Sequence, residues 1–241
     1  MGDVAADRSS RANGGPRLLA AIVADDDATW AAAGFRVEAG VARVDATDLV
    51  LAGPDPGGSR GLTGWTLAGV DPGGLVDGAL DGLPTTVTEP GDADDPDVAL
   101  PHPNGVVGLD HVVVATPNLE RTIEACAAIG LDLRRIRDVD ETGTGLRQAF
   151  FRLGPTLLEV VSGPTGSGRP ASEEPATFFG LALDVDDLDA TALRLGDGLG
   201  PIKPAVQPGR RIATLRHRTF AMTTSIALMD RHGERAPGTD R

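Results

Sequence analysis

Two stretches of the sequence repeat one another, and this repeat constrains the fold more than any other feature. GLDHVVVATPNLERT (108–122) aligns without a gap with TFFGLALDVDDLDAT (177–191). Each stretch has an apolar run typical of a strand, then a turn of Pro, Asn or Asp, then Leu119 or Leu188 at the start of a helical pattern. Such self-similarity indicates two copies of one structural unit in the chain.

The residues that follow each stretch predict the rest of the unit. After the first stretch, Gly130 ends the helical pattern, a strand begins at Leu131, and two more strands cover 146–153 and 156–163. The order is therefore βαβββ. In the second copy the same order is expected from a helix at 188–195, a weak strand at 201–207, and strands at 211–218 and 222–230.

One βαβββ unit leaves an apolar sheet face that it cannot bury alone, so two copies in one chain are expected to pair and enclose a cleft. A weaker copy of the pattern covers 18–53, and 64–80 resembles a truncated fourth unit. We therefore expect an α+β protein of paired βαβββ modules, with a well-formed C-terminal pair and a degenerate N-terminal pair. Generic α+β alternation without common origin is the alternative for the N-terminal part.

Polar, low-complexity sequence marks the expected boundaries. The acidic, Pro- and Gly-containing EPGDADDPD (89–97) is typical of a linker and places a domain boundary near Ala99. The expected organisation is a disordered tail at 1–16, degenerate modules and the acidic linker at 17–98, a C-terminal domain at 99–232 with modules at 107–163 and 177–230, and a disordered tail at 233–241.

Charge and cysteine content limit the possible partners. The formal net charge is −13, and residues 1–100, with 17 acidic and 6 basic side chains, carry −11 of it. Such a chain repels nucleic acid and anionic lipid, so a small molecule is the expected partner, with the protein a monomer or homodimer. Cys126 is the only cysteine, and no apolar leader or spanning segment is visible, so the cytoplasm is the expected location.

The pattern GLDHVVVATPNLERT, followed by FFRLG and TLLEVV, resembles the vicinal oxygen chelate superfamily of glyoxalases, bleomycin-resistance proteins, extradiol dioxygenases and methylmalonyl-CoA epimerase. The resemblance covers 107–163 well, 177–230 moderately and 17–88 weakly. In that superfamily each unit tends to offer a His from its first strand and a Glu from its last as metal ligands. The resemblance therefore implies that His111 and Glu159 hold one divalent ion (Zn, Ni, Mn or Fe) and act in catalysis. No glycine pattern indicates a nucleotide cofactor.

The other copies depart from this ligand pattern. The positions equivalent to His111 and Glu159 are Gly180 and Ala227 in the second C-terminal copy, and Ala20 and Val50 in the N-terminal copy. None of these four residues can ligate a metal through its side chain. Two ligands hold a catalytic divalent ion poorly unless another group completes the shell.

Two further histidines are candidate substitute ligands. His102 (LPHPNG) precedes the first strand, and His217 (LRHRT) is expected on the third strand of the last copy. The alternative for each is a histidine that makes an ordinary hydrogen bond.

Five polar side chains are candidate substrate-binding groups. Gln148 and Arg152 share one face of a strand, Arg216 has the corresponding place in the last copy, and Arg210 and Arg211 lie in a turn at the expected rim of the cleft. Guanidinium groups here could clamp a carboxylate, a phosphate or a CoA-type substrate. The alternative is a solvated outer face with surface ion pairs.

Two functions fit these residues. In the first, the chain is a metal-assisted enzyme of lyase, isomerase or dioxygenase type, in which an ion on His111 and Glu159 binds vicinal oxygens of a small substrate. In the second, the chain is a metal-free protein that binds or sequesters a small molecule, with His111 and Glu159 as a hydrogen-bonded pair. The remaining hypotheses are a metal-free enzyme with His111 or Glu159 as general base and a purely structural module.

Overall fold

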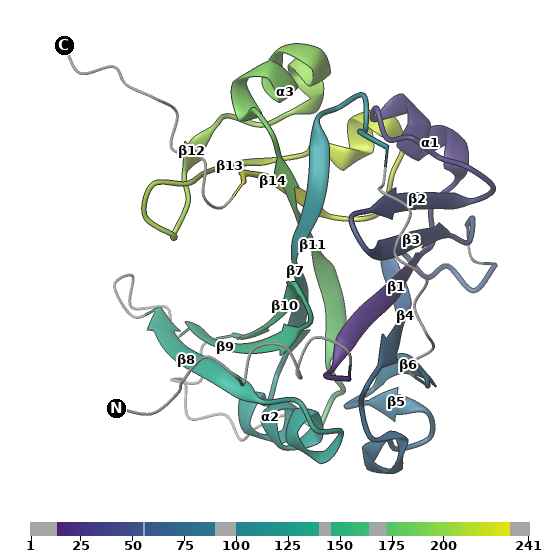
Figure 1. The fold of residues 1–241 in the computed structure, drawn as a ribbon, viewed down its shortest axis with the longest axis vertical. Coiled ribbons are helices and arrows are strands. Elements are labelled where there is room, and N and C mark those ends of the chain that lie inside the picture. Colours follow the sequence, from purple (N-terminus) through teal and green to yellow (C-terminus); the bar gives the residue numbers. More distant parts are fainter. Residues whose placement is uncertain (1–13, 55, 90–99, 140–145, 164–172, 232–241) are drawn as a thin grey trace, which may run out of the picture.

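A computed structural model describes most of the chain and shows two sheets (Figure 1). The described residues are 14–54, 56–89, 100–139, 146–163 and 173–231. Most of the acidic linker and nearly all of both expected tails lie outside them, so those expectations stay predictions. Within the described residues, no helix has the length and apolar character that crossing a membrane requires.

The C-terminal sheet is built from two βαβββ modules. The first consists of β7 (Val106–Thr116), α2 (Leu119–Ala128), β8 (Leu133–Val139), β9 (Leu146–Leu153) and β10 (Thr156–Ser162). The second consists of β11 (Thr177–Val185), α3 (Leu188–Leu195), the 3-10 turn η3 (Gly196–Gly198), β12 (Lys203–Pro204), β13 (Arg211–Thr214), the 3-10 turn η4 (His217–Phe220) and β14 (Ile226–Asp230). The predicted order is confirmed, although the strand expected at 211–218 ends at Thr214.

The N-terminal sheet repeats this plan in reduced form. Its elements are β1 (Arg17–Val23), α1 (Asp27–Ala32), β2 (Val41–Val44), β3 (Thr47–Leu51), β4 (Leu62–Ala68), the 3-10 turn η1 (Pro72–Gly74), β5 (Ala79–Leu80) and β6 (Leu83–Thr88). The first half has two strands after its helix instead of three, and the second half has η1 where a helix would stand. The expected α+β fold of paired modules, degenerate at the N-terminus, is therefore confirmed.

Strand pairing is equivalent in the two sheets. The strand orders are β12-β13-β14-β11-β7-β10-β9-β8 and β2-β3-β1-β4-β6-β5. In each sheet the first strands of the two modules pair antiparallel at the centre, β7 with β11 and β1 with β4. Within each module the first and last strands pair in parallel. Each module thus places its first and last strands side by side near the middle of a sheet.

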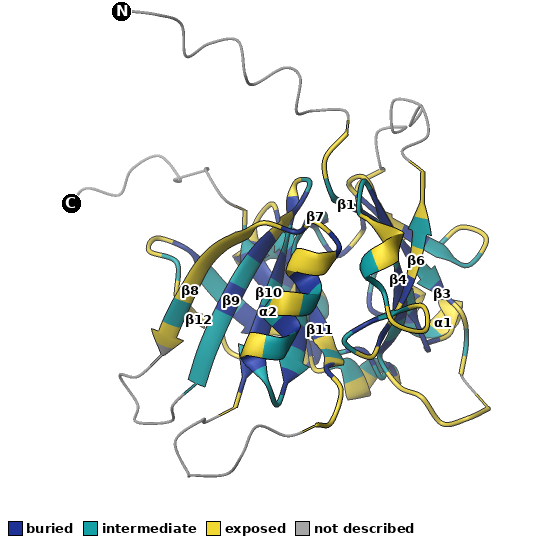
Figure 2. Ribbon diagram, turned by 90° about the horizontal axis from the view of Figure 1, so that it is seen from below, coloured by how far each residue is buried: buried dark blue, intermediate teal, exposed yellow. Residues whose placement is uncertain are grey.

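The helices begin in the same way in both C-terminal modules. The side chain of Asn118 accepts a hydrogen bond from the backbone N–H of Arg121, and that of Asp187 accepts one from Ala190. These caps satisfy amide groups that the first helical turn leaves unpaired. Figure 2 shows α2 lying across β9 and β10, with its exposed residues on the side away from the sheet. On the buried side lies Cys126, whose thiol has its pKa raised to about 12 by burial and by the charge of Asp81, as expected of a packing thiol.

A buried carboxylate joins the N-terminal sheet to the last C-terminal module. Asp25 is 3% exposed, and its Oδ1 accepts hydrogen bonds from the backbone N–H and the hydroxyl of Thr223, at 2.6 and 2.7 Å. Its Oδ2 accepts from the N–H and hydroxyl of Thr224, at 3.2 and 2.6 Å, and from the indole N–H of Trp30 at 3.1 Å. Five donors therefore compensate the burial of one charge.

We predict that Asp25→Ala lowers the free energy of unfolding by about 3 kcal/mol, because it leaves buried donors from both halves of the chain unpaired. Chemical denaturation of both proteins measures the loss. The matched control is Asp26→Ala, an exposed neighbouring carboxylate that makes no capping hydrogen bond to α1, for which we expect a change below about 0.5 kcal/mol. Equal effects of the two variants would contradict the joining role of Asp25.

Candidate functional site

His111 and Glu159 lie on neighbouring parallel strands and point to the same side of the sheet. His111 pairs in register with Leu157, and Glu159 pairs with Val113. The Nε2 atom of His111 lies 3.1 Å from Oε2 of Glu159. The intervening Val112 is buried in the core, so this pair occupies the face opposite the helices.

A register shift in β7 adds a second carboxylate to this pair. Between the pairs Ala182–His111 and Leu183–Leu109, residue Asp110 has no counterpart on β11. Such a bulge lets consecutive side chains approach each other. Oδ2 of Asp110 lies 2.5 Å from Nδ1 of His111. The imidazole is therefore held between two carboxylates.

Arg210 connects this triad to the second module. Its side chain is 5% exposed and donates to Oδ1 of Asp110 at 2.6 Å and to Oδ1 of Asp184 at 2.5 Å. Its Nε donates to the backbone oxygen of Asp230 at 2.7 Å. The fork of N–H groups on a guanidinium suits donation to several oxygens at once. Arg210 is thus a buried structural cation of the site.

Gln148 completes the polar cluster from β9. Its Nε2 donates to Oε1 of Glu159 at 2.5 Å. Its Oε1 is buried and has no hydrogen-bond partner among the described residues. A buried acceptor without a donor lowers the stability of the fold, so this oxygen can still accept a hydrogen bond from a bound ligand.

The carboxylates control the charge of the site. Burial alone would lower the pKa of His111, but hydrogen bonds to Asp110 and Glu159 and their negative charges raise it to about 9. Burial and the nearby charge of Asp110 raise the pKa of Asp184 to about 6, against the opposing effect of Arg210. His111 is therefore a cation near neutral pH.

Asp110 and Asp184 were not among the residues expected at the site. Each lies within an apolar strand run, GLDHVVV and GLALDV. Burial of a carboxylate without a partner costs free energy, so a carboxylate within an apolar strand run indicates a buried ion pair. The partner, Arg210, is remote in sequence from both carboxylates, so local sequence patterns could not predict these ion pairs.

Three of the expected arginines lie apart from this cluster. Arg211 pairs with Asp230 at 2.8 Å and with Asp189 at 2.9 Å. Arg152 is exposed and contacts the backbone oxygen of Gly154 at 3.5 Å. Arg216 is also exposed; it follows β13 and donates to the backbone oxygen of Asp197 at 3.1 Å. The expected arginine clamp is not assembled, because these guanidinium groups bind carboxylates or backbone oxygens elsewhere.

The two candidate substitute histidines are also elsewhere. His102 is 5% exposed; its Nδ1 accepts from the N–H of Arg36 and its Nε2 contacts the backbone oxygen of Arg43. Burial lowers the pKa of His102. It is a packing residue against the N-terminal sheet. His217 lies in η4 and not on a strand, because the chain turns after Thr214.

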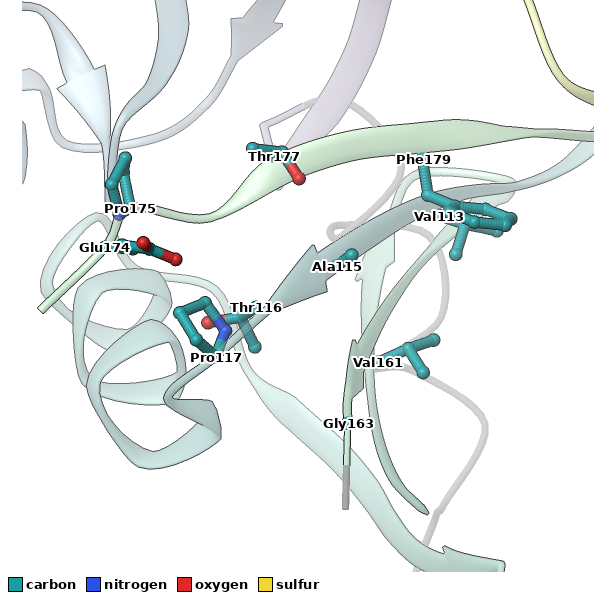
Figure 3. Close-up of a pocket in the computed structure, with 10 residues that line it drawn as sticks. All are labelled: Val113, Ala115, Thr116, Pro117, Val161, Gly163, Glu174, Pro175, Thr177 and Phe179. Atoms are coloured by element: carbon teal, nitrogen blue, oxygen red, sulfur yellow. The ribbon is translucent and has the colours of Figure 1, made fainter. Parts of the chain in front are cut away.

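An apolar pocket of about 440 Å³ lies against β7, β10 and β11 (Figure 3). The strand register places it on the same face of the sheet as the cluster. Its lining residues are Val113, Ala115, Thr116, Pro117, Val161, Gly163, Glu174, Pro175, Thr177 and Phe179. Val113 pairs in register with Glu159, and Ala115 pairs with Val161. The pocket therefore continues the row of side chains that begins with His111 and Glu159.

The donor set does not fit a catalytic divalent ion. No group of three or more His, Cys, Asp or Glu side chains is placed to hold a metal in the part of the chain that the structure describes. Both nitrogens of His111 contact carboxylates. A Cβ atom added at Gly180, the position equivalent to His111, would lie 2.4 Å from the backbone oxygen of Ser225. The second module therefore has no room for a side-chain ligand at this position.

The comparisons with known proteins agree with this architecture. Residues 108–220 match the family model of the Glyoxalase/Bleomycin resistance protein/Dioxygenase superfamily. This region of the chain therefore belongs to that superfamily, and the resemblance noted in the sequence is confirmed. No curated protein matches the chain.

Among solved structures, a mutant 4-hydroxymandelate synthase from Streptomyces coelicolor is similar over 92% of this chain and 94% of its own, with 16% identity and a TM-score of 0.59. A fusion of a xylose isomerase-like TIM barrel with 4-hydroxyphenylpyruvate dioxygenase is similar over 94% of this chain and 50% of its own, with 15% identity and a TM-score of 0.55. Both likenesses concern the fold and extend over both sheets. Methylmalonyl-CoA epimerase from Mycobacterium tuberculosis matches 55% of this chain and 93% of its own, with 24% identity and a TM-score of 0.43.

We predict that the folded protein loses stability as the pH rises through about 9. The pKa of His111 is raised from 6.5 to about 9, so the protonated ring stabilises the fold fully below pH 6.5 and ceases to do so above the folded pKa. The contribution is up to about 3 kcal/mol. Unfolding free energies of wild type and His111→Gln at pH 6 and pH 9.5 measure it as the difference between the two proteins. A His111 ring resonance that titrates near 6.5 would refute the prediction.

Proposed function

We propose that the chain binds a small, largely apolar molecule in the pocket beside His111 and Glu159, without a resident divalent metal ion. One observation carries the proposal. The polar cluster is closed by its own ion pairs, and an apolar pocket adjoins it on the same face of the sheet. Such a pairing of an apolar cavity with a few oriented polar groups is typical of ligand sites.

The pocket has the size and lining of a small-molecule site. A volume of about 440 Å³ falls in the usual range for such cavities. Val113, Val161 and Phe179 supply apolar walls, and Phe179 is 65% exposed although it is a large apolar residue. Figure 3 shows these three side chains directed to one side of the sheet. A bound apolar molecule would remove this surface from water.

The first prediction of this proposal concerns the pocket. The neutral fluorescent dye Nile red is expected to bind wild type, and Ala115→Trp should weaken binding at least about tenfold because the indole fills the cavity. The matched control is Ala127→Trp, on the exposed face of α2, which should leave binding within about twofold. Fluorescence titration measures both, with circular dichroism to confirm folding. Unchanged binding in Ala115→Trp would exclude this pocket.

The second prediction concerns metal. Protein purified without chelator should contain well below one equivalent of any divalent ion in elemental analysis. Catalytic sites use three protein ligands, and the described residues offer no group of three His, Cys, Asp or Glu side chains placed to hold an ion. His111→Ala is the matched variant. A stoichiometric ion that is lost in this variant would overturn the metal-free proposal and support the metal-assisted lyase, isomerase or dioxygenase.

A second candidate is proton transfer on the bound molecule. The observation that favours it is the chain of contacts from Asp110 through His111 to Glu159, at 2.5 and 3.1 Å, because Glu159 pairs in register with a residue of the pocket lining. Glu159 would accept a proton and His111 would hold the carboxylate in place. Exchange of a ligand C–H for solvent deuterium, lost in Glu159→Gln, is the measurement for this role.

A further inference from the structure

We propose that the molecule bound in this pocket carries an N–H or O–H donor on an apolar body, with an aliphatic ammonium group preferred and a carboxylate or phosphate rejected. This inference rests on the proposed function and adds the chemical class of the ligand. It follows from an account of which donors and acceptors of the polar cluster are already used.

Each side-chain nitrogen of the two cations in the cluster contacts an oxygen of the protein. His111 contacts Asp110 through Nδ1 and Glu159 through Nε2. Arg210 donates through Nε and both terminal nitrogens, and its side chain is 5% exposed. The two cations beside the site are therefore bound by the protein's own carboxylates and backbone. An anionic ligand would have to displace one of these carboxylates.

Acceptor atoms of the cluster have unused hydrogen-bonding capacity. Each oxygen of Glu159 receives one donor, from Gln148 or from His111, whereas a carboxylate can accept about four hydrogen bonds in total. The Oε1 atom of Gln148 is buried and receives no donor from the described residues. A ligand can satisfy such groups only by donating to them.

The charges around the pocket favour the same ligand class. Glu159 lies at one end of the row of pocket residues, where it pairs in register with Val113 of the pocket lining. The other arginine of the 208–211 turn, Arg211, pairs with Asp230 and Asp189 and does not reach the cluster. The side chains that a ligand meets at the polar end are thus neutral or negative once the internal pairs are counted.

The apolar walls define the rest of the ligand. Val113 on β7 pairs in register with Glu159 on β10, and Val161 lies two residues after Glu159 on β10. A ligand group that donates to Glu159 would therefore place its adjoining carbon atoms between Val113 and Val161. The expected ligand has its donor at one end of a compact apolar body.

The test compares three probes that share one body and differ in the end group: 1-naphthylmethylamine, 1-naphthalenemethanol and 1-naphthoic acid. Dissociation constants are measured for the full chain at pH 7 by calorimetry or intrinsic probe fluorescence. We expect the amine to bind at least about tenfold more tightly than the acid, with the alcohol between them, because a charge-assisted hydrogen bond to Glu159 is available only to the ammonium.

Two variants assign the preference to one carboxylate. Glu159→Gln keeps the size of the side chain and should weaken amine binding about tenfold, while alcohol binding changes less than about threefold. Glu124→Gln, on the exposed side of α2, removes the same charge at a distance and should leave all three probes unchanged. If Glu159→Gln does not fold, the order of the three probes on wild type decides the question.

The outcomes separate this inference from the proposed function. Equal binding of the three probes, all weakened by Ala115→Trp, keeps the pocket and overturns the donor preference. Tightest binding of the acid also overturns it. If none of the probes binds and Nile red does not respond to Ala115→Trp, the proposed function fails together with the inference.

Discussion

The antiparallel pairing of two first strands organises the whole chain. β7 pairs with β11 and β1 pairs with β4, and each of these strands also pairs with the last strand of its own module. A single module would leave its apolar sheet face exposed to water. Pairing of the two modules buries this face. Because β7 and β10 stand near the centre, their polar residues are surrounded by strands on both sides, which explains how His111 and Glu159 remain mostly buried.

Burial of this many charges is tolerated because they are matched within the cluster. Three carboxylates, Asp110, Glu159 and Asp184, contact two cations, His111 and Arg210, and each contact lies between 2.5 and 3.1 Å. Removal of one member would leave its partner charged and desolvated, a larger penalty than the pair contributes when intact. The cluster is therefore a unit drawn from both modules, in which Arg210 supplies positive charge from the second module.

The sequence predicted the repeating parts of the structure well and the irregular parts poorly. The helix starts at Leu119 and Leu188, the order of strands and the equivalence of Glu159 with Ala227 all follow from local patterns. The pairs Val113–Glu159 and Ala182–Ala227 have the same register. The bulge at Asp110 could not be predicted, because it depends on pairing with β11. The buried position of Arg210 likewise depends on carboxylates 26 and 100 residues away in sequence.

At the position equivalent to His111, the second module differs from the first in its backbone as well as in its side chain. At Gly180 the chain passes so close to Ser225 that an added Cβ would lie 2.4 Å from its backbone oxygen and 3.0 Å from its Cβ. A register shift between Phe178 and Gly180 accompanies this approach and leaves Phe179 exposed at the pocket. A histidine restored at position 180 would therefore force the strands apart before it could reach an ion. The close contact between Gly180 and Ser225 leaves no space for a side chain at position 180, and the adjacent Phe179 lines the pocket. The second module therefore contributes an apolar side chain and Arg210 to the site.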